Sequence, residues 1–224
     1  SLPPAPFLVA VTMTAGRGEP MIRVAADISP EWLPAAERVV CRFDRERLAV
    51  VEEVQRCHGA LILHRRPQAT LSDPQRAASL LAAAAAAEPS RALNMTEAVS
   101  EWLIRLRWLA NALPELELPT FTDLTPLIAQ WSVGRHSFAA LRRLDLKREL
   151  AAQMTWSQRE ALRAEAPEHF VLPTGRRVRI RYEAPDHPPV IAARIQQLFG
   201  VEQTPRLARG TVAVRVHLLA PNNR

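Results

Sequence analysis

The sequence predicts an α+β fold with three regions, and three observations support this. Short apolar runs separated by turns, which are typical of strands, fill residues 7–66. Capped runs with helical spacing fill residues 67–169, and a strand-like pattern returns after residue 170. We therefore expect an N-terminal antiparallel β domain over residues 1–66, a helical region over 67–169, and a β-β-α-β unit over 170–224 that packs with the helical region.

The first region predicts a compact barrel or an open sheet. Apolar runs at 7–13 and 21–28 flank a turn, and the runs at 39–43, 48–54 and 61–64 continue as a meander. Ser29-Pro30-Glu31 supplies a cap, a proline at the first helical position and an acid in the first turn. This segment predicts a short helix over residues 32–36.

Caps and apolar spacing define the helical region. Ser72-Asp73-Pro74 opens a helix that stops before Pro89, and Asn94 with Glu97 resembles a capping box for the next one. Further helices are expected at 124–131, from 137 to 154, and from a Thr155/Gln158 cap onward. Tryptophans at helical spacing belong more often to the core than to a base-stacking surface, and this region has four: Trp102, Trp108, Trp131 and Trp156.

The C-terminal region combines a hairpin, a helix and a strand. Pro173-Thr174-Gly175 is the expected turn of a hairpin over residues 170–182. Residues 188–199 predict a helix with Ile191, Ile195, Leu198 and Phe199 directed inward and Gly200 as its stop. Residues 211–219 predict a final strand whose inward face holds Val212, Val214, Val216 and Leu218.

The positive charge is concentrated at the C-terminal end. The whole chain has a formal net charge of +6, and residues 171–224 alone hold 9 Arg against 3 acids. A local basic excess is typical of a protein with a polyanionic partner. Lys147 is the single lysine, and this arginine bias can also reflect GC-rich coding. The clustering of the charge is therefore better evidence than its total.

One segment places three arginines on the same face of a strand. Arg177, Arg179 and Arg181 alternate with Val178, Ile180 and Tyr182. Like charges on one strand face repel unless acids or a polyanion lie opposite them. Either a nucleic acid binds this row, or acids from the helical region neutralise it. If Arg215 lies on the same side, it extends the row. The candidate nucleic-acid-binding residues are Arg177, Arg179, Arg181, Arg215, Arg206, Arg209, Arg17 and Arg23.

The first region offers a weaker version of the same pattern. Arg17 and Arg23 lie among acidic residues, so a solvated surface is the better interpretation there. Gly16-Arg17-Gly18 is too short to form a phosphate-binding loop and is expected to be a turn.

Catalytic motifs are absent from the sequence. There is no phosphate-binding loop with its lysine, no nucleophile elbow and no zinc-protease motif, so we expect no catalytic, cofactor or metal residue in this chain. Cys41 and Cys57, even with His58 and His64, lack the paired spacing of zinc ligands and are expected to be reduced thiols on neighbouring strands. No apolar run is long enough for membrane insertion, and we expect a cytoplasmic location.

Two groups of motifs carry a family resemblance. Phe7-Leu8-Val9-Ala10, Ile22-Arg23-Val24-Ala25-Ala26 and Ser29-Pro30-Glu31-Trp32-Leu33 resemble the oligonucleotide-binding (OB) fold of DEAH/RHA helicases. Pro173-Thr174-Gly175-Arg176, residues 188–200, Thr204-Pro205-Arg206-Leu207-Ala208 and His217-Leu218-Leu219-Ala220-Pro221 are similar to the C-terminal signature of the HrpB helicases within that group. The motifs occur in order along nearly the whole chain.

The resemblance implies a longer protein that translocates on RNA. Its motor domains would bind ATP and magnesium, and no position here matches the catalytic residues of the family. The family pattern also implies a first OB strand before Ser1 and a further strand after Arg224, so we expect the barrel to be incomplete. Two roles stay open: an accessory module that binds RNA or single-stranded nucleic acid, and a module that docks a protein partner or the motor domains. Exposure of Trp108 and Trp131 would favour docking.

Overall fold

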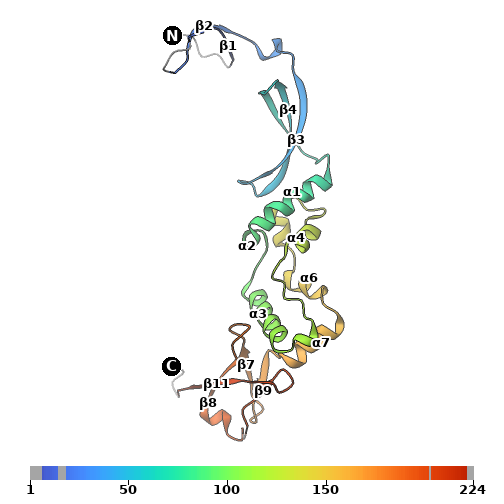
Figure 1. Cartoon of the computed structure of the whole chain (residues 1–224), viewed down its shortest axis with the longest axis vertical. Coiled ribbons are helices and arrows are strands. Elements are labelled where there is room, and N and C mark those ends of the chain that lie inside the picture. Colours follow the sequence, from blue (N-terminus) through green and yellow to red (C-terminus); the bar gives the residue numbers. More distant parts are fainter. Residues whose placement is uncertain (1–6, 15–18, 202, 221–224) are drawn as a thin grey trace. The chain divides into compact units, whose positions relative to one another are not determined.

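The computed structural model describes residues 7–14, 19–201 and 203–220 of the chain. The chain divides into two compact units, Ser1–Leu81 and Ala82–Arg224, with the boundary inside helix α1 (Pro74–Ala87) (Figure 1). No helix among the described residues is both long enough and apolar enough to cross a membrane.

The first unit contains two antiparallel sheets. Strands β1 (Leu8–Thr14) and β2 (Met21–Asp27) form a hairpin. Strands β3 (Ala36–Asp44), β4 (Ala49–His58) and β5 (Leu61–Gln68) form a three-stranded meander in the order β3-β4-β5. The predicted antiparallel strands are therefore present.

The predicted OB-like barrel is not found among the described residues. A barrel closes when strand pairing runs around the whole sheet, whereas β1-β2 and β3-β4-β5 are separate sheets. Several apolar side chains of the hairpin accordingly stay in solvent, and Val11 and Met21 are 63% and 66% exposed. The helix predicted at 32–36 is a single 3-10 turn, η1 (Pro30–Trp32), because Pro34 has no N–H with which to continue it.

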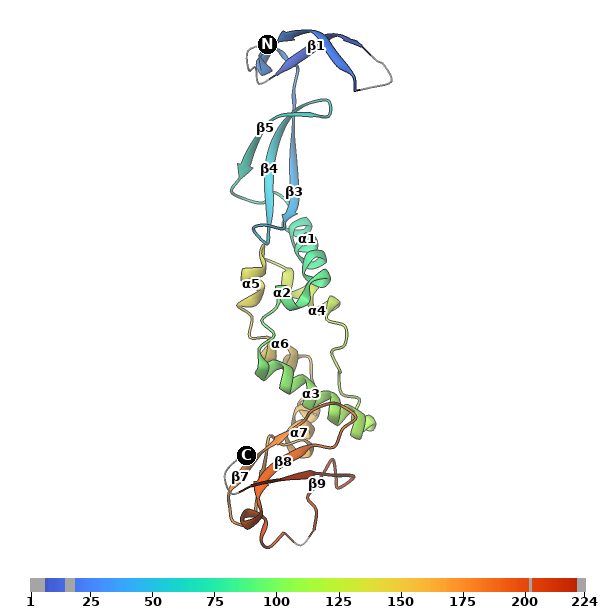
Figure 2. The same cartoon turned by 90° about the vertical axis from the view of Figure 1, so that its left-hand side faces the viewer.

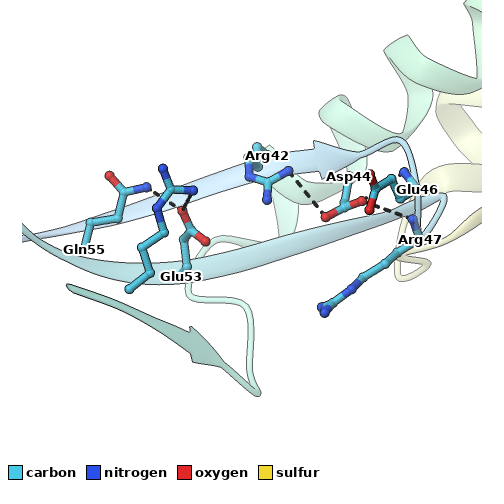
Figure 3. A network of polar contacts seen from close by, with 7 residues as sticks. Arg42, Asp44, Glu46, Arg47, Glu53 and Gln55 are labelled. Carbon is cyan, nitrogen blue, oxygen red and sulfur yellow. Dashed lines mark hydrogen bonds and ion pairs between the residues drawn. The ribbon is translucent and has the colours of Figure 1, made fainter. Parts of the chain in front are cut away.

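Polar contacts hold the β3–β4 turn and the segment that follows β5 in place. Asp44 Oδ1 accepts hydrogen bonds from the backbone N–H groups of Glu46 and Arg47, each at 3.0 Å, and closes the β3–β4 turn (Figure 3). The buried carboxylate of Glu52 on β4 accepts from the backbone N–H and the hydroxyl of Ser72, at 2.9 and 2.8 Å. These two bonds hold the segment that follows β5 against β4.

Helices make up the first part of the second unit. After α1 come α2 (Pro89–Ala92), α3 (Glu97–Ala112), the 3-10 turn η2 (Pro114–Leu116), α4 (Thr125–Ser132), α5 (Phe138–Arg142), α6 (Leu146–Ala152) and α7 (Trp156–Glu165). Helix α3 lies against α6 and α7 (Figures 1 and 2). It buries Val99, Trp102, Leu103, Leu106, Trp108 and Leu109, so it forms the centre of this core.

Two details of the predicted helices are wrong and one is confirmed. Helix α3 is capped by Thr96, whose hydroxyl accepts from the N–H of Val99 at 3.3 Å, and not by Asn94. The helix predicted from 137 to 154 is two helices, because Asp145 accepts from the N–H of Arg148 and starts a new one. The capping box of Thr155 and Gln158 is present at the start of α7.

The C-terminal part is a four-stranded sheet in the order β11-β8-β7-β6. Strands β6 (His169–Val171), β7 (Arg177–Arg181) and β8 (Val190–Arg194) are antiparallel neighbours, and β11 (Arg215–Leu219) runs parallel to β8. The 3-10 turn η3 (Ile195–Leu198) and the short pair β9 (Arg206–Leu207) and β10 (Val212–Ala213) lie between β8 and β11 in sequence.

The helix predicted over residues 188–199 is wrong, because β8 occupies its first half. As a central strand, β8 is covered on both faces, and Val190 and Ile191 are fully buried. Such a strand is a continuous apolar run, which periodicity cannot distinguish from a buried helix. Ile195 and Phe199, predicted to be inward, are 55% and 67% exposed.

The predicted final strand is interrupted. The N–H of Val214 donates to the carbonyl of Pro205 at 2.8 Å, outside the sheet, and this separates β10 from β11. Val214 is buried as predicted, but Leu218 is 61% exposed, so the predicted inward alternation fails along β11. The observed C-terminal unit is therefore a mixed sheet and not a β-β-α-β unit.

Candidate nucleic-acid interface

Strand β7 separates its arginines from its apolar residues, as the alternation predicted. Val178 and Ile180 are buried, at 8% and 4% exposure, whereas Arg177, Arg179 and Arg181 are exposed. Successive side chains of a strand point to opposite faces. One face of β7 therefore packs on the protein and the other presents three guanidinium groups.

Sheet register brings Arg215 to this same face. Arg181 lies opposite Val190, and Val190 lies opposite Arg215. Directly paired residues share a face of a sheet, so Arg181 and Arg215 lie on one face with β8 between them. Two strand spacings separate their backbones, a distance of about 10 Å. We call Arg177, Arg179, Arg181 and Arg215 the arginine face.

Acids neutralise only part of the arginine face. Arg179 forms an ion pair with Glu101 of α3. Glu168, which directly precedes β6, pairs instead with Arg105 at 2.6 Å, and Glu165 accepts from the backbone N–H of Arg209. Within the described ranges, Arg177, Arg181 and Arg215 have no ion pair. Neutralisation by the helical region therefore accounts for one of the four arginines.

A hollow of about 280 Å³ lies beside the arginine face. It is lined by charges of both signs, including Arg179 and Arg181 from β7, Lys147 from α6, and Glu101 from α3. The phenol of Tyr182 also lines it and donates to the carbonyl of Pro167 at 2.8 Å. Burial raises the pKa of Tyr182, so this hydroxyl stays protonated and keeps its donor role.

The other predicted arginines lie elsewhere. Arg206 donates to the carbonyl of Gly210 at 2.9 Å within the β9–β10 connection, and Arg209 pairs with Glu115 at 3.0 Å. Both side chains therefore already have a partner. Arg23 is exposed on β2 of the first unit, and Arg17 lies outside the described residues. The structure therefore brings together four of the eight candidates.

Two histidines and a further arginine also lie on this face. His169 lies opposite Arg179 in the register, and His217 lies two residues beyond Arg215 on the same strand. Arg194 lies opposite Leu219, which is also on this face. The alternation of Arg215, His217 and Leu219 was visible in the sequence, but the helix expected at 188–199 concealed Arg194.

The tryptophans are mainly core residues. Trp102, Trp108 and Trp131 are 6%, 2% and 4% exposed, so none of them offers a ring for stacking or docking. Trp108 lies against Tyr182 with ring centroids 5.0 Å apart, which ties α3 to the end of β7. Trp156, expected in the core, is 72% exposed because it occupies the first position of α7.

The cysteines do not form a metal site. Among the described residues there is no group of three or more His, Cys, Asp and Glu side chains that could hold a metal ion. Cys41 on β3 and Cys57 on the adjacent β4 are buried and free. Burial raises the pKa of the Cys41 thiol, with a further rise from the charge of Glu52, which disfavours the reactive thiolate.

Comparison with known proteins connects this geometry to one family. Residues 127–224 match the HrpB C-terminal family, described as "ATP-dependent helicase C-terminal". A curated relative, the ATP-dependent RNA helicase HrpB of Escherichia coli strain K12, is 36% identical over 138 residues, which cover 59% of this chain and 17% of that protein.

Solved structures agree. The crystal structure of the E. coli DExH-box NTPase HrpB matches 97% of this chain with a TM-score of 0.64 and 25% identity. That of the Escherichia coli DEAH/RHA helicase HrpB matches 95% with a TM-score of 0.62 and 27% identity. In both cases this chain covers 28% of the solved protein. The family match, the identity to E. coli HrpB and the two structural matches together support the identification of this chain as a C-terminal region of an HrpB helicase.

Proposed function

We propose that this chain is a nucleic-acid-binding accessory region of an ATP-dependent RNA helicase and has no ATPase activity of its own. Its partner would be RNA or single-stranded nucleic acid. The observation that supports this is the arginine face, on which Arg177, Arg181 and Arg215 are exposed without an acidic partner among the described residues.

The chemistry of these side chains favours phosphate. A guanidinium group presents a fork of N–H donors that matches two phosphate oxygens, and it stays charged at any physiological pH. A sheet face with several such groups contacts the backbone of a strand without reading its bases, because phosphates carry no sequence information. The expected binding is therefore tolerant of sequence and sensitive to salt.

The motor function would lie in the rest of the protein. ATP and magnesium would bind its motor domains, and the present chain would hold the strand and dock on those domains. The sequence supports this division, since no phosphate-binding loop with a lysine occurs in it. We propose the cytoplasm as the location.

The direct experiment measures single-stranded RNA binding by the 224-residue chain at two salt concentrations, together with ATP hydrolysis in the presence and absence of RNA. We expect RNA binding that weakens steeply as salt rises, similar affinity for unrelated sequences, and no hydrolysis. Hydrolysis by the pure chain would contradict the accessory role. Absence of RNA binding at low salt would contradict the nucleic-acid role.

A docking role is the alternative, and the β1-β2 hairpin favours it. Val11, Met13, Met21, Ile22 and Val24 are each at least half exposed. Exposed apolar clusters often mark protein contacts. A pure docking module predicts that the chain binds the motor domains of its own protein and has no affinity for RNA. The burial of Trp108 and Trp131 removes both residues as docking elements.

A further inference from the structure

A second and larger hollow shares the Arg105–Glu168 ion pair with the first. It has a volume of about 510 Å³ and is lined by residues of α3, α6, α7, β6 and β7. Buried apolar side chains form part of its wall, including Trp102, Met154 and Leu162. The remainder is strongly basic and comprises Arg105, Arg159, Arg163, Arg177 and His169. We call it the α7 hollow.

The charges of the α7 hollow do not cancel. Glu168 is the single acid that lines it, and that carboxylate is already bound by Arg105 at 2.6 Å. Arg159 donates one hydrogen bond, to the carbonyl of Ala151 at 3.3 Å. Arg163 and Arg177 make no ion pair and no side-chain hydrogen bond with any described residue. Three guanidinium groups therefore face this space without a counter-charge.

The like charges that line the hollow repel each other in the absence of an anion. Arg159 and Arg163 are four residues apart on α7, where like charges destabilise a helix. Some arginines of this unit are engaged by backbone carbonyls: Arg142 donates to the carbonyl of Arg91, and Arg135 donates to that of Trp131 at 2.7 Å. The α7 hollow, by contrast, gathers three arginines with unused donors around one space.

We propose that the α7 hollow binds a phosphate ester group, contributed by the backbone of the strand that the arginine face contacts. This inference rests on the proposed function and adds Arg159, Arg163 and His169 to the interface. Arg177 belongs to both surfaces, since it lies on the arginine face and lines the hollow. A phosphate suits the site because its oxygens accept from several guanidinium groups at once, and one phosphate ester is compact enough for the space.

Two pairs of variants separate the hollow from the arginine face. Arg159→Ala/Arg163→Ala changes residues that line the hollow and lie outside the sheet. Arg181→Ala/Arg215→Ala changes residues of the sheet that do not line the hollow. Arg143→Ala/Arg148→Ala is the matched control, because it removes two exposed arginines that belong to neither surface.

Binding of a fluorescent oligouridylate to the 224-residue chain is then measured over a salt series. We expect the hollow pair to weaken binding roughly tenfold and to reduce the salt slope by about 1.4, since two phosphate contacts are lost. The control pair should change the slope by much less. Arg163→Lys should keep most of the salt dependence of binding, because lysine keeps the positive charge. Its affinity for the oligouridylate should still fall, because lysine lacks the planar fork of N–H donors.

The outcomes distinguish the two proposals. If the face pair weakens binding and the hollow pair behaves like the control, the inference is overturned and the proposed function stands. If only the hollow pair weakens binding, the hollow is supported and the arginine face is not the binding surface. If neither pair differs from the control, both proposals fail. Thermal unfolding of each variant verifies that a loss of binding is not a loss of fold.

A second arm identifies the source of the phosphate. Uridine 5′-monophosphate is titrated into the chain and into Arg159→Ala/Arg163→Ala, with chemical shifts as the readout. If the phosphate comes from the backbone of a strand, the unmodified chain should bind the mononucleotide weakly or not at all. The variant should then lose binding of the oligouridylate. The opposite result is that the chain binds the mononucleotide, that the variant loses this binding, and that its affinity for the oligouridylate is unchanged. That result would support a phosphate ester site for a free nucleotide and overturn the backbone assignment.

Discussion

Arg105 of α3 and Glu168, which directly precedes β6, form an ion pair with a nitrogen–oxygen distance of 2.6 Å. The guanidinium side chain is 11% exposed and the carboxylate 57% exposed, so the pair reaches from the core to the surface. It lines both hollows. Because Glu168 is committed to Arg105, it forms no ion pair with the neighbouring Arg177 or Arg181.

The first prediction concerns the strength of this ion pair. Glu168→Gln should destabilise the chain by roughly 1–3 kcal/mol, between the values for exposed and buried pairs. The reason is that Arg105 would keep a largely buried charge, and its Nε already lacks a hydrogen-bond partner among the described residues. Urea denaturation at neutral pH measures the change. Glu160→Gln, at an exposed position of α7, is the control and should change stability little.

The second prediction is the pH dependence of the same contribution. Partial burial raises the pKa of Glu168, but the charge and hydrogen bond of Arg105, together with the charges of Lys147 and His169, lower it by more, so the pKa lies below its ordinary value of 4.5. The stabilisation is therefore complete above about pH 4.5 and is lost as the pH falls through the lower pKa of the folded state. The stability difference between the wild type and Glu168→Gln should be constant above that pH and shrink below it. A difference that grows on acidification would contradict this.

The third prediction tests the strand that replaced a predicted helix. In a helix over residues 188–199, Ile191 and Ile195 would both face inward, whereas the structure buries Ile191 completely and leaves Ile195 55% exposed. Ile191→Ala should therefore cost roughly 2–5 kcal/mol of unfolding free energy, and Ile195→Ala less than about 0.5 kcal/mol. Chemical denaturation of the two variants measures both values. Equal losses of unfolding free energy in the two variants would favour a helix over residues 188–199.

The fourth prediction separates free from paired arginines. Arg181→Ala should lower the salt slope of RNA binding by about 0.7, because it removes one charge available to a phosphate. Arg209→Ala should have a smaller effect, since Arg209 is already paired with Glu115 at 3.0 Å. Fluorescence anisotropy with a single-stranded RNA over a salt series gives both slopes. Equal changes in the two salt slopes would mean that RNA binding depends only on the total charge of the chain.

Features that depend on residues close together in the sequence could be predicted, and features that depend on distant segments could not. The alternation along Arg177–Arg181 and the capping box at Thr155 involve residues a few positions apart, and the structure has both. Strand β8 could not be distinguished from a helix, because its burial depends on β11, more than 20 residues later in the chain. Barrel closure depends on pairing between distant strands, which the periodicity of a single strand does not encode.

The same reasoning applies to the candidate interface. Strand alternation was enough to place three arginines on one face, whereas the position of Arg215 required the register of β11 with β8. The acids opposite the row could not be assigned from sequence. Glu101, which pairs with Arg179, is 78 residues away in the chain, while Glu165 and Glu168 engage other groups. The α7 hollow likewise combines residues of five elements and has no signature in any one of them.

The most direct test of the central claim is the salt dependence of single-stranded RNA binding by Arg177→Ala/Arg181→Ala/Arg215→Ala. These three residues are the arginines of the face without an acidic partner among the described residues. The account predicts that the variant stays folded, binds RNA more weakly, and has a salt slope reduced by about 2, in proportion to three lost phosphate contacts. A folded variant with the affinity and salt slope of the unmodified chain would contradict the claim that this face binds nucleic acid.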